Sequence, residues 1–124
     1  MSTLEVSNLN DGTTTVATTF VTNGSAKSWL NLNGTGTIAT RDSLNVSSVT
    51  DTGTGSYTVN INNDMANANH CATTTHDSSA YSADRDGVTT TTMAVGSYRR
   101  DIVLSGTGNQ DNTLVCSAIY GDLA

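Results

Sequence analysis

The residues best suited to chemistry are two histidines, each followed by a second potential metal ligand. His70 precedes Cys71 and His76 precedes Asp77, and imidazole, thiolate and carboxylate groups are ligands of Zn²⁺ and related ions. In an extended segment the two histidines share one face but lie roughly 20 Å apart. One ion cannot bridge them unless the chain turns, although a threefold axis would gather three copies of either histidine. We therefore predict no metal site within one chain and place both histidines at the surface or an interface.

Other arrangements of reactive residues fall short of a site. Residues 84–87, D-R-D-G, are similar to the opening of a calcium loop, but no glutamate follows as the bidentate ligand. Arg85 neutralising two carboxylates in a polar loop is the simpler interpretation. Neither histidine has the context of a catalytic triad, no G-x-S-x-G motif occurs, and His70 and Cys71 point to opposite faces of a strand. We predict no enzyme activity and no cofactor, and we place function in a surface.

Composition argues against several partners and indicates association between copies. The formal net charge is −6, with only five lysines and arginines, too few for the basic stripe that binds nucleic acid or for insertion into an anionic membrane. Hydrophobic residues make up 35% and aromatic residues 5%, while Thr, Ser, Asn and Gly dominate, which is typical of β structure with a thin core. Because a small domain buries little apolar area alone, we expect oligomerisation.

The N-terminal residues lack the basic and apolar regions of a secretory signal. No stretch of the sequence is long and apolar enough to span a membrane. We therefore expect synthesis in a reducing cytoplasm, where Cys71 and Cys116 are buried thiols rather than a disulfide.

Alternating apolar and polar residues, punctuated by Gly, Asn and Asp, predict an all-β domain over residues 26–124. Leu30 and Leu32 share one face of the first strand, with Trp29 on the other, and the last strand is apolar on both faces, which is typical of a central strand. Turns are expected at residues 52–55 and 106–111, and an exposed loop at residues 76–87. About eight short strands are expected, in residues 26–33, 37–41, 44–51, 56–62, 68–75, 88–95, 97–105 and 114–120. This pattern predicts an antiparallel β-sandwich or small barrel and no helix of useful length.

Residues 1–25 differ from the rest and form a predicted N-terminal arm. The arm contains Leu4, Val6, Leu9 and Phe20, which are interface candidates because they need a partner surface. Asn23-Gly24-Ser25 is a turn and a plausible hinge. We expect an extended arm that docks on a neighbouring chain for attachment or assembly, and the alternative is a partly ordered tail.

Aromatic and arginine side chains are the remaining candidates for contacts with other molecules, because both are enriched at binding interfaces. Trp29, the only tryptophan, suits a sugar-stacking platform or an interface anchor, and we favour burial between copies. Contacts with an external ligand are expected from Tyr81, Arg85, Tyr98, Arg99 and Arg100. The alternative is that these five are solvated loop residues.

Several segments carry motifs of one family. Residues 26–37, A-K-S-W-L-N-L-N-G-T-G-T, are similar to A-K-A-W-V-N-F-[ND]-G-T-G-T. Residues 41–51, R-D-S-L-N-V-S-S-V-T-D, match R-x-S-F-N-V-S-S-I-T-D, and residues 53–61, G-T-G-S-Y-T-V-N-I, match G-T-G-D-Y-T-V-N-F. These patterns resemble small virion structural proteins of marine tailed bacteriophages, commonly described as tail-fibre proteins. The likeness is dense over residues 26–70 and loose over residues 73–112.

The resemblance implies a virion component, usually homotrimeric, at the particle surface. It favours a tail-fibre or spike module that mediates host attachment, with other virion proteins and a host surface glycan or protein as partners. The alternative is a capsid decoration (cement) protein that stabilises the head lattice, which the shortness of the chain favours. A third alternative is a free carbohydrate-binding domain or a hydrolase. Both of the virion alternatives imply synthesis in the bacterial host cytoplasm and a final location on the virion surface.

Overall fold

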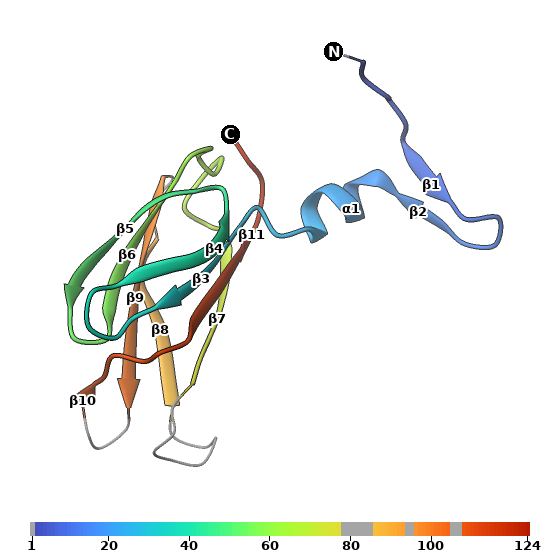
Figure 1. The fold of residues 1–124 in the computed structure, drawn as a ribbon. Coiled ribbons are helices and arrows are strands. Elements are labelled where there is room, and N and C mark those ends of the chain that lie inside the picture. The colour runs from blue at the N-terminus through green and yellow to red at the C-terminus, as the bar shows by residue number, and fades with distance from the viewer. Residues whose placement is uncertain (1, 78–85, 94–95, 105–107) are drawn as a thin grey trace.

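The chain folds into two facing antiparallel sheets from which an N-terminal arm projects (Figure 1). The structure, a computed structural model, describes residues 2–77, 86–93, 96–104 and 108–124. The sheets hold most of the described residues, and one short helix lies in the arm. The expected all-β, antiparallel fold is confirmed.

The first sheet has four strands in the order β4-β3-β11-β7. These are β4 (Ala39–Leu44), β3 (Ser28–Asn33), β11 (Val115–Tyr120) and β7 (Cys71–His76). Every neighbouring pair is antiparallel. β11 lies between β3 and β7, so the prediction that the last strand is central is confirmed.

The second sheet is built around β9 (Ser97–Leu104) and β6 (Ser56–Ile61). β6 pairs with β5 (Val46–Gly53), while β9 also pairs with β8 (Asp86–Met93) and β10 (Gly108–Asn109). The turn predicted between β5 and β6 is present, and Gly55 has a φ of 65° there. Glycine suits that left-handed conformation because it has no Cβ.

A single residue, Asn45, carries the chain from β4 in one sheet to β5 in the other. Its φ is 57°, a left-handed conformation that asparagine tolerates better than most residues. Its side-chain amide donates to the carbonyl oxygens of Lys27 at 3.0 Å and Asn63 at 3.1 Å, and its Oδ1 accepts the Asn63 N–H at 2.7 Å. Asn45 thereby ties the corner to both neighbouring segments.

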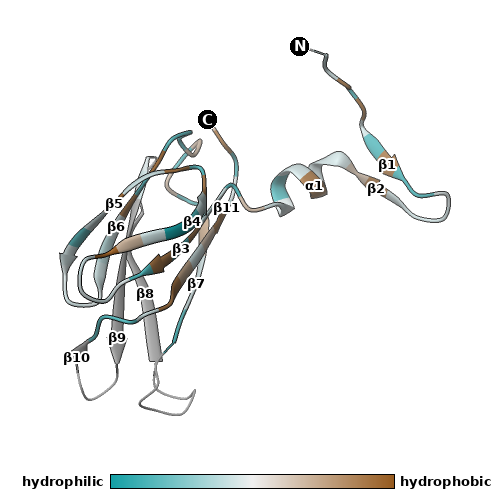
Figure 2. Ribbon diagram, viewed as in Figure 1, coloured by the Kyte–Doolittle hydropathy of each residue, from teal (hydrophilic) through white to brown (hydrophobic). Residues whose placement is uncertain are grey.

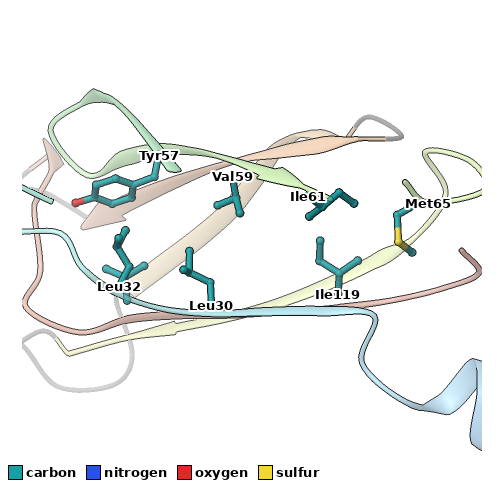
Figure 3. Packing of buried hydrophobic residues seen from close by; sticks show 8 residues of the cluster. Leu30, Leu32, Tyr57, Val59, Ile61, Met65 and Ile119 are labelled. Carbon is teal, nitrogen blue, oxygen red and sulfur yellow. The ribbon is translucent and has the colours of Figure 1, made fainter. Parts of the chain in front are cut away.

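The hydrophobic core lies between the two sheets (Figure 3). Its members come from β3, β6 and β11, with one residue from the loop after β6. The buried hydrophobic residues are Leu30, Leu32, Tyr57, Val59, Ile61, Met65, Val115 and Ile119. The predicted inward face of β3 is confirmed, since Leu30 and Leu32 are buried while Trp29 lies on the outer face.

One end of the core is closed by a polar network around the Tyr57 hydroxyl. This oxygen lies 3.0 Å from Asp111 Oδ1 and 3.1 Å from the Gly34 carbonyl oxygen. The same Asp111 oxygen accepts the Gly55 N–H at 2.6 Å, and the Gly34 N–H donates to the Asn112 carbonyl oxygen at 2.9 Å. A Cβ at Gly34 would overlap the Tyr57 hydroxyl and lie 2.8 Å from Tyr57 Cζ. The ring therefore fits only because residue 34 has no side chain.

The arm departs from the predicted extended form. It contains a two-stranded hairpin, β1 (Asn8–Asn10) and β2 (Thr15–Ala17), followed by helix α1 (Thr18–Gly24). The sequence predicts no helix of useful length, and α1 has only seven residues, which is too short to show a helical period. Among the described residues, no helix has the length and apolar character to cross a membrane.

The expected burial of the two cysteines is also wrong. Cys71 is exposed and Cys116 is half-buried, because both side chains lie on the outer face of the four-stranded sheet. The register pairs Cys71 with Tyr120 and Cys116 with Thr75, which separates the cysteines by four residues along β11, about 13 Å. That separation is too large for a disulfide.

Candidate functional site

The hairpin of the arm is fixed by local hydrogen bonds. Leu9 pairs with Val16 across the two strands, and in the turn the Asp11 carboxylate accepts the N–H groups of Thr14 at 2.7 Å and Thr13 at 2.9 Å. These bonds to the ionised form hold the pKa of Asp11 below its ordinary value. An isolated two-stranded hairpin is marginally stable in water, so the arm gains order if it docks on a partner.

Helix α1 is attached at both ends. Thr18 donates its N–H to the Ser7 carbonyl oxygen at 2.9 Å and its hydroxyl to the Val6 carbonyl oxygen at 3.1 Å. At the other end, Lys27 Nζ donates to the carbonyl oxygens of Thr22 and Ser25, where a cation also complements the helix dipole.

The backbone of Lys27 joins the arm to the four-stranded sheet. Its N–H donates to the Ile119 carbonyl oxygen of β11 at 2.8 Å. One residue therefore contacts both the end of the helix and the central strand β11 of the sheet, which sets the direction in which the arm leaves the domain.

The arm exposes large apolar side chains and has no buried residue within positions 2–25. Leu4 is 84% exposed and Phe20 is 74% exposed. The other exposed apolar side chains of the arm are Val6, Leu9, Val16 and Val21, and apolar positions recur along the arm away from the two sheets (Figure 2). Full burial of each such side chain stabilises an interface by about 1.5–3 kcal/mol. Docking of the arm on a partner surface is therefore energetically favourable.

A second candidate surface lies on the outer face of the four-stranded sheet. The register places Ala118 between Trp29 and Thr73, and Cys116 between Asn31 and Thr75. Because the outward side chains of β11 are smaller than Trp29, they leave a shallow hollow of about 360 Å³, which we call the Trp29 groove. It is lined by Trp29, Leu30, Asn31, Thr73, Thr74, Thr75, Cys116, Ser117 and Ala118.

The rim of the Trp29 groove combines an apolar and a charged side chain from β4. Leu44 pairs with Trp29 across the strands and is 48% exposed. Arg41 is the extra residue at a bulge in the β3–β4 pairing, and its Nη1 lies 3.5 Å from Asn31 Oδ1.

Asp77 follows β7 and fastens it to the beginning of β11. Its carboxylate accepts the Thr113 hydroxyl, and it accepts the Leu114 N–H at 2.5 Å. Burial by itself raises the pKa of Asp77, but these hydrogen bonds and the charge of Arg41 outweigh it and hold the pKa below its ordinary value of 3.8.

Replacing Asp77 by asparagine is expected to lower the free energy of unfolding at pH 7 by less than about 1 kcal/mol, because the carboxylate is exposed to solvent. The stabilisation by the carboxylate is complete above pH 3.8, the ordinary pKa, and disappears as pH falls through the lower folded-state pKa. Urea titrations of both chains at several pH values measure the difference. A difference that grows on acidification contradicts the assignment.

The histidines do not converge on a metal site. His70 Nδ1 lies 3.1 Å from the Asn67 carbonyl oxygen, and His76 lies on the inner side of β7, opposite Val115. Both are half-buried rather than fully at the surface. Within residues 2–77, 86–93, 96–104 and 108–124, no group of three His, Cys, Asp or Glu residues is placed to hold an ion.

The structure places only some of the predicted contact residues. Tyr81 and Arg85, together with Asp84 of the calcium-like segment, lie outside the described residues. The backbones of Tyr98, Arg99 and Arg100 belong to β9, and their side chains lie outside the described part. Trp29, Leu4, Val6, Leu9 and Phe20 are solvent-accessible on the two surfaces described above.

Sequence reasoning identified the apolar arm and Trp29, but it missed the residues that give them shape. Ala118 and Cys116 form the groove only through the register of β11 against β3 and β7, which one sequence does not reveal. The role of Lys27 depends on a helix that the pattern did not predict. In comparisons with protein-family models, curated proteins and solved structures, nothing matched this chain.

Proposed function

We propose that this chain is a structural protein of a tailed-bacteriophage particle, a homotrimeric tail-fibre or spike module at the virion surface that mediates host attachment. In this proposal the two sheets form a β-sandwich and the arm serves assembly. The motif resemblance of residues 26–70 supplies the phage context, and the exposed arm supplies the structural argument.

The observation that carries the proposal is the apolar surface of the arm. Phe20 and Leu4 keep most of their surface in water although the arm is ordered by its own hydrogen bonds. A scattered exposed apolar residue needs no explanation, but a projecting segment that carries six of them is typical of an interaction site. Association with other copies and with a neighbouring virion protein buries that surface.

The opposite end of the domain is suited to contacts with the host. The arm joins β3 at its first residue, whereas Gly34 and the Tyr57–Asp111 network lie beyond its last residue. The chain also leaves β7 at that far end, because His76 pairs with Val115 and Asp77 bonds to Leu114. Tyr81 and Arg85 follow in sequence, and three copies would multiply a weak contact with a surface glycan or protein.

A capsid decoration protein is the second candidate, because the exposed apolar side chains of the arm would also suit contacts with neighbouring capsomers. In that function the arm would join neighbouring capsomers and stabilise the head lattice. The two candidates share the arm and differ in where the protein sits and in how many copies one particle carries.

Electron microscopy of particles with this protein labelled tests the proposal. A tail-fibre or spike module predicts label at the tail in a few trimers, and a decoration protein predicts many copies over the head. Deleting residues 1–25 is expected to abolish incorporation while the remaining domain keeps its β-sheet circular dichroism. Absence of label from purified particles overturns the virion function, and normal incorporation of the truncated chain overturns the role of the arm.

A further inference from the structure

We infer that the N-terminal arm of one copy docks in the Trp29 groove of a second copy, with Phe20 of the arm against Trp29. The inference rests on the oligomeric part of the proposed function and adds the two surfaces that meet. Each chain contains both surfaces: an ordered arm with exposed apolar side chains, and a shallow groove beside the Trp29 ring.

The structure favours a second copy over the chain's own arm. Trp29 comes only four residues after Ser25, the C-cap of helix α1. Lys27 Nζ donates to the carbonyl oxygens of Thr22 and Ser25 at the end of the helix, and its N–H donates to the Ile119 carbonyl oxygen of β11. Folding the arm back into its own groove would break these contacts, so the groove of each chain stays open to the arm of another.

A single arm-to-groove contact joins the segment from β1 to α1 on one copy to the nine residues that line the groove on the other. One such contact is smaller than a standard interface, which has about 20–30 residues a side. In a cyclic assembly every copy donates one arm and receives another, so each buries both surfaces.

The shapes and charges of the arm and of the groove are also complementary. Ala118 and Cys116 leave room beside Trp29 for a ring, and aromatic pairs in offset or edge-to-face contact add to the gain from burial. Residues 1–26 contain Glu5 and Asp11 and no lysine or arginine, while Arg41 lies at the rim of the groove. An arm-to-groove contact joins two different surfaces, and such a contact forms a closed ring when its rotation allows, as in a trimer.

Trp29 reports on the contact directly because it is the only tryptophan. In the full chain, its fluorescence emission is expected to shift to the blue as concentration rises, in step with the mass measured by sedimentation. Phe20→Ser is expected to abolish the shift at the same concentrations and to raise the Kd of association by about 30-fold or more, the effect of removing an aromatic hot spot. Thr19→Ser, on the same exposed helix, is the matched control and should associate like the parent.

A mixing experiment identifies which surfaces meet. Phe20→Ser damages the arm and keeps the groove, whereas Ala118→Lys fills the groove and keeps the arm. Each full-length variant alone is expected to be monomeric, and the mixture is expected to form a one-to-one dimer through the remaining arm and groove. Association of Ala118→Lys alone points to arm–arm contact, and association of Phe20→Ser alone points to contact without the arm. Either result, or no association in the mixture, overturns the inference.

Alkylation of Cys116 in a Cys71→Ser chain gives an independent readout that does not require the Ala118→Lys substitution. Cys116 lines the groove, so its reaction with a maleimide is expected to slow as the chains associate and to recover with Phe20→Ser. An unchanged rate during association overturns the inference as well. None of these outcomes depends on phage particles, so failure here with normal incorporation into particles removes the arm-to-groove contact and leaves the virion function standing.

Discussion

Replacing Gly34 by alanine is expected to lower the free energy of unfolding by about 3 kcal/mol, at the upper end of the usual cost of overpacking a core. The new Cβ would overlap the Tyr57 hydroxyl and lie 3.0 Å from the Asn112 carbonyl oxygen. Neither neighbour can yield easily. Tyr57 is fully buried and its hydroxyl contacts Asp111, while the Asn112 oxygen accepts the N–H of Gly34 itself.

Gly24→Ala is the matched control, because it makes the same chemical change where no atom lies within 4 Å of the added carbon. We expect it to change the free energy of unfolding by less than about 0.5 kcal/mol. Urea denaturation followed by circular dichroism measures both variants. Equal stability of the two would contradict the packing of Tyr57 against residue 34.

Replacing Leu32 by alanine is expected to cost about 2–5 kcal/mol, because a fully buried side chain between the two sheets leaves a cavity that its neighbours fill only in part. Leu123→Ala removes the same atoms from a side chain that is 42% exposed, and we expect it to cost less than about 1.5 kcal/mol. The measurement is again urea denaturation, carried out at a concentration where the chain is monomeric. A Leu32→Ala chain as stable as Leu123→Ala would mean that the core is not where the two sheets face each other.

The sequence predicts well those strands in which buried and exposed side chains alternate. Tyr57, Val59 and Ile61 alternate with polar residues, and they form the core face of β6. Residues 115–120 form the central strand β11, with β3 and β7 on either side, and its Val115 and Ile119 face the core. The glycines between β5 and β6 likewise mark the turn that they form.

The parts that the sequence does not predict depend on contacts between distant residues. Helix α1 is held by Ser7 and Lys27 rather than by a repeating pattern, and the Trp29 groove exists only because Ala118 pairs with Trp29. The need for glycine at position 34 depends on Tyr57, which is 23 residues away. Such pairings follow from register and topology, which a single sequence leaves open.

The mass of the full chain in solution over a range of micromolar concentrations tests most directly whether its exposed apolar surfaces serve association. Sedimentation is predicted to show trimers with three times the mass of one chain, and Phe20→Ser is predicted to return the mass to that of the monomer. A full chain that remains a stable monomer across this range would contradict the claim that copies of this protein bury one another's exposed apolar surfaces.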